Sequence, residues 1–279
     1  MTIATEIATE IAAEISGASA GAAVPMVGWS YNDVLKESIA NDLGVSFNAD
    51  YTKMFSFDAS TDDLAEHTMD ANDITSISLV DTTSPGGSWN LIHNRLNAAG
   101  TKLLGMHGYN MFQFPLSGAF DASTIGAWDA SWSPSEGGNQ AWCFNTAQDK
   151  IFMTDPDGVV YRYDIATDGT ITSAPVFDTG ESFDLQSLVV ESFANVFTMQ
   201  MSTDEKYLVL TRNDSKVDTY ELTTAGVLSD GVTLVQTADI SSIIVFGNSI
   251  RGAWLDDANK KFYVMHSGNG TLYEVDYTG

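Results

Sequence analysis

The sequence contains little cysteine, histidine or positive charge. Of its 279 residues, one is cysteine and four are histidine, and 12 basic residues stand against 37 acidic ones, a formal charge of −25. The lone Cys143 excludes an intrachain disulfide, and we expect it to be buried in the apolar run 141–144. A surface this negative repels phosphate backbones and anionic lipid headgroups, so we expect neither nucleic acid nor a membrane as partner.

Long apolar runs and targeting signals are also missing. No stretch approaches the roughly 18 apolar residues of a membrane span, and residues 1–7 lack the positive segment of a secretory signal. Export to an extracellular location would therefore need lysis or a dedicated export system. The hydrophobic fraction of 44% is nevertheless large enough for a sizeable core, so we expect a folded chain.

After residue 23 the chain repeats a turn that ends in lysine and is followed at once by an apolar strand. The turns end 48 to 56 residues apart, at Lys53, Lys102, Lys150, Lys206 and Lys261. A period of this length suits a four-stranded blade of a β-propeller. We expect each lysine to cover its hairpin turn rather than to hold a ligand.

Each repeat shows the same order of strands. A first strand precedes the lysine, a second follows it, and a third with alternating aromatics comes after a short polar loop. The expected first strands are 44–47, 89–96, 141–144, 196–201 and 250–255. A fourth strand is expected in four repeats, near 74–80, 125–132, 174–178 and 232–236.

The fifth repeat stops at Gly279, directly after its third strand. Residues 24–31 precede the first repeat and stand where a fourth strand would be, so pairing them with the last repeat would close the ring. The sequence therefore predicts an all-β fold, a five-bladed β-propeller over residues 24–279 with the N-terminal strand closing the last blade.

Residues 1–23 differ in composition from the rest of the chain. Isoleucine recurs at every fourth residue, which predicts a short amphipathic α-helix, and residues 17–23 are typical of a flexible tether. The stripe consists of Ile3, Ile7, Ile11 and Ile15. One such stripe cannot stabilise an isolated helix, so we expect it to dock on other proteins or on copies of itself as an assembly device. The alternative is a frayed tail without a role.

The second repeat resembles a known kind of propeller repeat. Its two halves, residues 100–104 (GTKLL) and 116–124 (LSGAFDAST), are similar to the pattern "GTK" with two apolar residues followed by "LSTAFDxST". That pattern occurs in propeller repeats of phage structural proteins and in uncharacterised proteins of environmental microbes. Residues 57–61 (FDAST) echo the second half in the first repeat. The resemblance implies a module found in virions and supplies no catalytic residues.

Polar residues recur five positions after the repeat lysines, at the ends of the second strands. They are Asp58, His107, Asp155, Thr211 and His266. In a closed propeller they would form a ring on one face, and histidine with aspartate can bind a divalent cation. The alternative is an ordinary ring of surface residues. A divalent cation is the only cofactor that the sequence suggests.

Patterns for catalysis are weak. Five-bladed propellers include glycosidases, whose acids stand on inner strands around a central funnel, but residues 45–47, 141–144 and 197–201 contain no carboxylate. The six tryptophans are expected to pack between blades. A glycan would be held instead by the loop 107–110, through His107, Tyr109 and Asn110.

These observations favour a non-enzymatic virion structural or attachment protein, such as a capsid decoration, head fibre or tail component. Its expected partners are other virion proteins, copies of itself and host-surface glycans, and its expected location is the virion. A carbohydrate-binding propeller outside any virion, located extracellularly, is the alternative. A glycoside hydrolase comes third.

Overall fold

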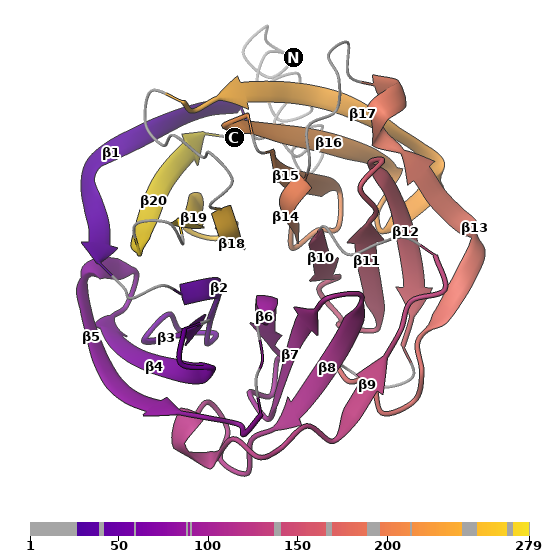
Figure 1. Ribbon diagram of the computed structural model, residues 1–279. Helices are drawn as coiled ribbons and strands as arrows, with labels where there is room; N and C mark the ends of the chain where they lie inside the picture. The colour runs from indigo at the N-terminus through magenta and orange to yellow at the C-terminus, as the bar shows by residue number, and fades with distance from the viewer. Residues whose placement is uncertain are drawn as a thin grey trace, which may run out of the picture.

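The computed structural model describes residues 27–38, 42–58, 60–87, 89, 91–136, 141–165, 169–188, 196–212, 214–241, 250–266 and 270–278. Within them the chain forms five four-stranded antiparallel sheets arranged around a central axis (Figure 1). The five-bladed propeller predicted from the repeats is confirmed. The helix and tether predicted for residues 1–23, with Ile3, Ile7, Ile11 and Ile15, lie outside the described residues.

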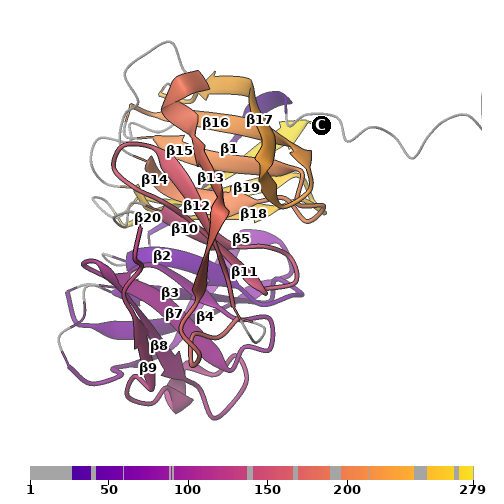
Figure 2. The same cartoon turned by 90° about the vertical axis from the view of Figure 1, so that its right-hand side faces the viewer.

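The sheets follow one another along the chain. In blades 1 to 4 the strands stand in sequence order from the inside outward, and in blade 5 β1 lies outside β18, β19 and β20. Blades 1 and 2 consist of β2 (Asp42–Phe47), β3 (Lys53–Asp58), β4 (Asp63–Asp70), β5 (Asp73–Thr83), β6 (Ile92–Leu96), β7 (Lys102–His107), β8 (Asn110–Pro115) and β9 (Ala130–Trp132). Blades 3 and 4 consist of β10 (Ala141–Phe144), β11 (Lys150–Thr154), β12 (Val159–Asp164), β13 (Val176–Asp184), β14 (Val196–Met201), β15 (Tyr207–Arg212), β16 (Lys216–Thr224) and β17 (Val227–Asp239). Blade 5 consists of β18 (Ile250–Asp256), β19 (Lys261–His266), β20 (Thr271–Thr278) and β1 (Val27–Ser38). Figure 2 brings the outer strands β13 and β17 toward the viewer.

The ring is closed by the two ends of the propeller sequence. β1 pairs antiparallel with β20, from Val27 opposite Thr278 to Ser38 opposite Thr271. The predicted closing strand is confirmed, although it continues to Ser38 instead of ending at residue 31. Because the first described strand completes the sheet of the last three, the ring closes through backbone pairing and β20 is left with no open edge.

The apolar core is divided into five clusters, one between each pair of neighbouring blades. Trp132 and Trp142 pack together between blades 2 and 3, while Trp89 and Trp254 are partly buried against two other clusters. The prediction that tryptophans pack between blades is confirmed for these four. It is wrong for Trp128, which is 48% exposed and touches Phe112 edge to face, with ring centres 5.8 Å apart.

A polar residue at the end of each inner strand shapes the turn that follows. In blades 1 to 3 its side-chain oxygen accepts the backbone N–H groups four and five residues later, at 2.8 to 3.1 Å. In blade 4 the Oγ of Ser202 accepts the N–H of Tyr207 at 2.8 Å, and in blade 5 Oδ1 of Asp256 accepts the N–H of Asn259 at 3.1 Å. These capping residues are Asn48, Asn97, Asn145, Ser202 and Asp256.

The turns correct the alignment of the fourth repeat by one residue. The lysines of the other blades stand five residues after the cap, but Lys206 stands four after Ser202. Tyr207 occupies the equivalent place, because it starts β15 as the lysines start β3, β7, β11 and β19. Lysine spacing alone therefore gave the wrong register in this repeat.

Neighbouring blades are joined by polar contacts that start from the third strands. Oε2 of Glu66 on β4 accepts the N–H of Ala122 in blade 2 at 2.9 Å, and Oε1 accepts Lys53 Nζ at 2.7 Å. The same Nζ donates to Phe120 O at 2.8 Å. On β8, Oε1 of Gln113 accepts the N–H of Ile171 in blade 3 at 2.9 Å. We call the two hydrogen bonds accepted by Glu66, from Ala122 and from Lys53, the Glu66 latch.

Arg162 on β12 makes the corresponding contact toward blade 4. Its Nη1 donates to Gly226 O at 3.3 Å, and its guanidinium also pairs with Asp178 and Glu181. In blade 5, Lys261 contacts Glu274 of its own blade and donates to Asn72 O of blade 1 at 3.1 Å. Two of the repeat lysines, Lys53 and Lys261, thus join blades as well as starting strands.

The second half of the repeat motif has a structural role in the Glu66 latch. Residues 118–124 form a turn that ends in the short 3₁₀-helix η1 (Ala122–Thr124). At its start Oδ1 of Asp121 accepts the N–H of Ser123 at 3.1 Å. This segment uses its backbone groups for local turns and for the latch, so the fourth strand predicted at 125–132 is shortened to β9.

The echo at residues 57–61 has a different origin. Asp58 ends β3, a second strand, whereas Asp121 lies between a third and a fourth strand. Both aspartates accept the N–H and the hydroxyl of the serine two residues later, Ser60 and Ser123. The shared letters therefore reflect the same local turn chemistry at two non-equivalent positions.

Candidate ligand site on the propeller axis

A cavity of about 380 Å³ opens on the axis where the inner strands end. We call it the axial funnel. Its wall consists of residues near the ends of the five inner strands and of the turns after them, among them Phe47, Asn48, Tyr51, Leu96, Asn97, Phe144, Asn145, Gln148, Gln200, Met201, Trp254 and Leu255. All five blades contribute, so the cavity exists only in the closed ring.

Most side-chain amides of the wall are already engaged by the protein. The three asparagines cap their turns, and their Nδ2 groups donate to Thr52, Thr101 and Asp149. Gln200 Nε2 donates to Ala253 O at 2.6 Å, and Gln148 Oε1 accepts the N–H of Ala98 at 2.7 Å. These contacts fix the shape of the funnel.

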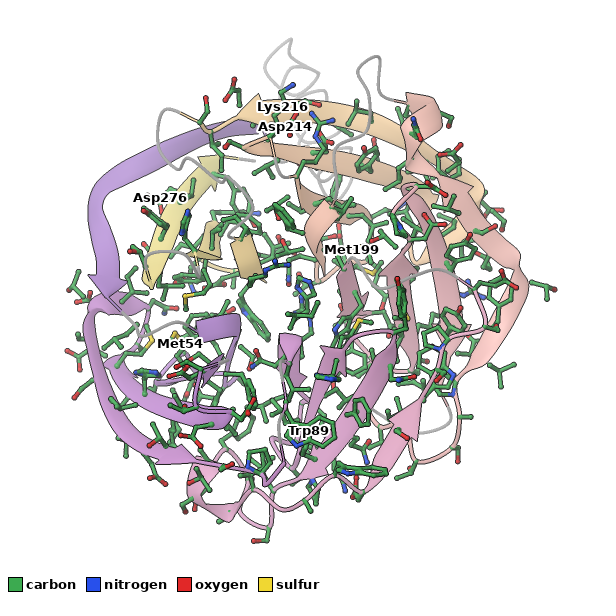
Figure 3. All side chains as sticks on the ribbon, viewed as in Figure 1. Met54, Trp89, Met199, Asp214, Lys216 and Asp276 are labelled. Carbon is green, nitrogen blue, oxygen red and sulfur yellow. The ribbon has the colours of Figure 1, made fainter. Side chains whose placement is uncertain are left out.

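Arg95 of β6 forms the floor of the funnel. The residue is only 8% exposed, and its guanidinium carbon lies 5.6 Å from the ring centres of both Trp142 and Trp254. Its Nη2 donates to Met199 O at 2.9 Å, and Figure 3 shows Met199 close to the centre of the ring. A cation of blade 2 is thus held by blades 3, 4 and 5 across the axis.

The guanidinium has few partners for a buried charge. A guanidinium has five N–H donors, and one of those of Arg95 makes a hydrogen bond within the described residues. The buried Nε has no partner there. Burial lowers the pKa of Arg95 to about 10, so the group remains charged at neutral pH. Burial also raises the pKa of the neighbouring Cys143 to about 12, so that the thiol stays neutral and gives the arginine no counter-charge. The predicted burial of Cys143 is confirmed.

The axis narrows sharply beyond Arg95. A second cavity of about 10 Å³ lies there, against Asn94, Trp142, Met199 and Gly252. A Cβ atom on Gly252 would stand 2.5 Å from the Cα of Gly44, so the inner strands β18 and β2 approach more closely than larger residues would allow. The cavity of about 380 Å³ thus lies on the side of the capping turns.

Carboxylates are missing from the part of the funnel wall that the structure describes. Among 37 acidic residues in the chain, none lines this cavity there. Glu205 and Asp257 lie nearby, where they accept hydrogen bonds from Asn145 Nδ2 at 3.0 Å and from the N–H of Thr203 at 2.6 Å. Acid-base chemistry on a sugar needs two carboxyl groups across the bond, and these walls supply neither.

The ring predicted at the ends of the second strands lies away from the funnel. Each second strand starts beside the capping turns and runs about 20 Å toward the opposite end of its blade. Asp58 and Asp155 use their carboxylates in local turns, with Ser60 and with Val159. His107 packs against Trp89 and Phe112, whereas His266 ends β19 at the equivalent position of blade 5.

Thr211 does not belong to this set of equivalent positions. Arg212 stands opposite Val196 on the inner strand, as His266 stands opposite Ile250, so Arg212 is the equivalent residue of blade 4. Thr211 is buried, with its Oγ1 2.8 Å from Oγ1 of Thr198. The misplacement follows from the one-residue shift of Lys206. In the described part of the chain, no three histidine, cysteine, aspartate or glutamate side chains are grouped closely enough to hold a metal ion.

The predicted glycan loop is the hairpin turn between β7 and β8. Tyr109 is 74% exposed, and the side chain of Asn110 is hydrogen-bonded to Ser133 Oγ. Trp89 lies in blade 2 (Figure 3), with ring centres 5.8 Å from His107 and 4.7 Å from Phe112. The loop is thus open to solvent beside aromatic side chains, at the end of blade 2 opposite the funnel.

Sequence reasoning missed Arg95, the residue on which this site depends. The positions two before the capping residues are Ser46, Arg95, Cys143, Gln200 and Trp254. Arginine is the only cation among them. A charged residue on strands that otherwise match the repeat was a signal for an axial site, but the search for acids on these strands passed over it.

Comparison with known proteins supports the fold and goes no further. No protein-family model matches the sequence, and no curated protein matches it. Among solved structures, Myxococcus xanthus glutaminyl cyclase is similar with a TM-score of 0.55 and 10% identity, covering 90% of this chain and 98% of that one. The Myceliophteria thermophila Cps50 (Swd1) β-propeller domain has a TM-score of 0.48 and 12% identity, covering 88% of both chains.

A chain of the Mitotic Checkpoint Complex is similar with a TM-score of 0.43 and 13% identity. The match covers 83% of this chain and 60% of that one, so the present chain spans less than two thirds of its length. At these identities the likeness concerns the propeller fold alone. No helix in the described residues is long and apolar enough to cross a membrane.

Proposed function

We propose that this chain is a non-enzymatic virion structural or attachment protein, and that its propeller recognises a ligand in the axial funnel. The observation that carries the recognition role is the funnel itself, with aromatic walls, a cationic floor and no carboxylate in its described lining. A cavity of about 380 Å³ is within the range of small-molecule sites. The virion part of the proposal is supported by the repeat motif at residues 100–124.

The motif supports the virion through its sequence resemblance, and its contacts show what it does in the fold. Its first half places Gly100 against Phe120 of its second half, where Phe120 N donates to Gly100 O at 2.9 Å. The motif thus holds the parts of its own blade together and supplies contacts to the neighbouring blade. It says nothing of a reaction.

Binding to a glycan array by the purified chain tests the recognition role. Ala98→Trp would fill the mouth of the funnel, and Tyr109→Ser would alter the predicted glycan loop at the other end of blade 2. We expect Ala98→Trp to abolish glycan binding and Tyr109→Ser to retain it. The reverse result would move recognition to the loop, and hydrolysis of any polysaccharide in a substrate screen would overturn the non-enzymatic assignment.

Immunogold labelling of purified particles with antibody against the propeller tests the virion assignment. We expect label on particles that carry this gene. Glycan binding together with unlabelled particles would favour the second candidate, a lectin-like propeller outside any virion, which the same funnel would serve.

A further inference from the structure

We infer that the axial funnel binds an acidic sugar, with the carboxylate of the sugar held by Arg95. This inference rests on the proposed recognition function and names the ligand class of that site. It follows from the charge of Arg95, the geometry of its neighbours and the shape of the funnel.

Arg95 differs from the other buried arginines in having no acidic partner within the described residues. Arg162 pairs with Asp178 and Glu181, and Arg212 pairs with Asp214 and Asp218. A buried charge normally needs such a partner, because desolvation costs several kcal/mol per ion. In a chain with 37 acidic residues, the exception is the arginine at the floor of the cavity.

The surroundings of Arg95 hold the cation without neutralising it. Trp142 and Trp254 stabilise its charge through their ring faces, and Met199 O accepts one of its N–H groups. Nε is buried, so the remaining N–H groups of the two Nη atoms are the donors that a carboxylate accepts in a bidentate pair. Arg95 is thus fixed in place by protein contacts while part of its hydrogen-bonding capacity stays unused.

The charge of the site favours a singly charged ligand. The floor offers one positive charge, and the field of a chain at −25 opposes the entry of further negative charge. A carboxylate matches the single guanidinium, whereas a doubly charged phosphate monoester would leave an excess charge in the cavity.

The walls favour a ring that is apolar on its faces and hydroxylated at its edges. Tyr51, Phe144 and Trp254 present aromatic surface to the cavity, and Gln148 and Gln200 add amide groups to the same wall. Sugar rings stack their C–H faces on such surfaces while their hydroxyl groups bond to polar groups around them. A carboxylate on a sugar satisfies both the floor and the walls.

Calorimetric titration of the full chain with D-glucuronate and with N-acetylneuraminate tests this inference. We expect saturable binding of at least one of these, and loss of that binding when the carboxylate is methylated. Benzoate and inorganic phosphate serve as comparison ligands. Equal affinity for benzoate would overturn the assignment to a sugar, and tighter binding of phosphate would overturn the assignment to a carboxylate.

Variants of Arg95 connect the binding to this side chain. Arg95→Met keeps the length of the side chain and should weaken binding by about thirtyfold or more, the loss expected when one member of a buried charged pair is removed. Lys260→Met removes the same charge from an exposed turn at the same end of the blades and should leave the affinity unchanged. Equal losses in both variants would point to net charge and overturn the inference.

Two further arms keep the test decisive. If Arg95→Met does not fold, Arg95→Lys retains the charge without the planar fork and should still weaken binding, and the methyl-ester comparison needs no variant. Glycan binding that is lost in Ala98→Trp but unchanged in Arg95→Met would leave the recognition function standing and overturn the role of Arg95. Absence of saturable binding by either acidic sugar to the wild-type chain would overturn the inference outright.

Discussion

Two residues in this propeller have roles that depend on a group that is absent. Arg95 has no carboxylate beside it among the described residues, so its charge is available to the cavity. Gly100 has no side chain, so the ring of Phe120 can lie against its backbone.

Gly100→Ala tests the packing of the repeat motif. A Cβ at this position would stand 2.4 to 2.5 Å from the ring of Phe120, and φ is +66°. We expect the free energy of unfolding to fall by about 1 to 3 kcal/mol, because Phe120 must move in a well-packed interface. The measurement is urea denaturation followed by fluorescence.

Gly86→Ala is the matched control for this substitution. Gly86 also has a positive φ, +77°, but nothing lies within 4 Å of an added Cβ. The difference between the two variants therefore isolates the contact with Phe120. Equal destabilisation by both would mean that backbone strain alone explains the loss.

At the scale of strands and blades, the sequence predicted the strands better than the contacts that join neighbouring blades. Inner strands were placed best where they are short apolar runs before a polar cap, as at 141–144 and 196–201, which agree with the structure residue for residue. The strand predicted at 89–96 carries polar residues and begins only at Ile92. The polar contacts between blades were not predicted, because Glu66 and Gln113 accept hydrogen bonds from residues 56 and 58 positions away. A repeat shows which residues are equivalent within each blade and leaves contacts between blades undetermined.

The axial site was missed for a related reason. Cation, aromatic walls and amides come from all five repeats, and the ring must be closed before they surround one cavity. Lysine spacing also misled the alignment in blade 4, where Lys206 stands four residues after its cap. The cap, which bonds to the backbone of its turn, was the more reliable marker of register.

Glu66→Ala tests whether the Glu66 latch stabilises the ring. The substitution would leave the N–H of Ala122 without its acceptor and the Nζ of Lys53 without its carboxylate, in an interface where Glu66 is 5% exposed. Lys53 would keep its hydrogen bond to Phe120 O. We expect the free energy of unfolding to fall by about 2 to 4 kcal/mol, measured by urea denaturation.

Lys150→Met is the corresponding control for a lysine whose ion pair lies within one blade. Its partner Asp149 is half exposed, and such surface pairs contribute about 1 kcal/mol or less. A loss in Lys150→Met as large as that in Glu66→Ala would show that the contact between blades has no special weight.

At the scale of the whole molecule, closure and charge act together. Pairing of β1 with β20 fixes the ring, and the ring creates the funnel. A chain with a charge of −25 repels its own copies, so assembly into a larger particle needs a specific contact that is stronger than this repulsion. The isoleucine stripe of residues 1–23 is the part of the sequence that we predict to supply that contact.

Deletion of residues 1–21 tests this assembly role. The truncated chain retains every described strand, since β1 starts at Val27, so its melting transition should be unchanged. Burial of four isoleucines in a helix interface would contribute roughly 6 to 12 kcal/mol before ordering costs, and we expect its loss to abolish oligomerisation or incorporation into the parent particle. Light scattering of the two chains measures the mass directly.

An Ile7→Ser, Ile11→Ser double variant of the full-length chain should have the same effect as the deletion, because it interrupts the stripe while keeping the segment. Equal masses for all three proteins, together with normal incorporation of the truncated one, would mean that the segment is a dispensable tail.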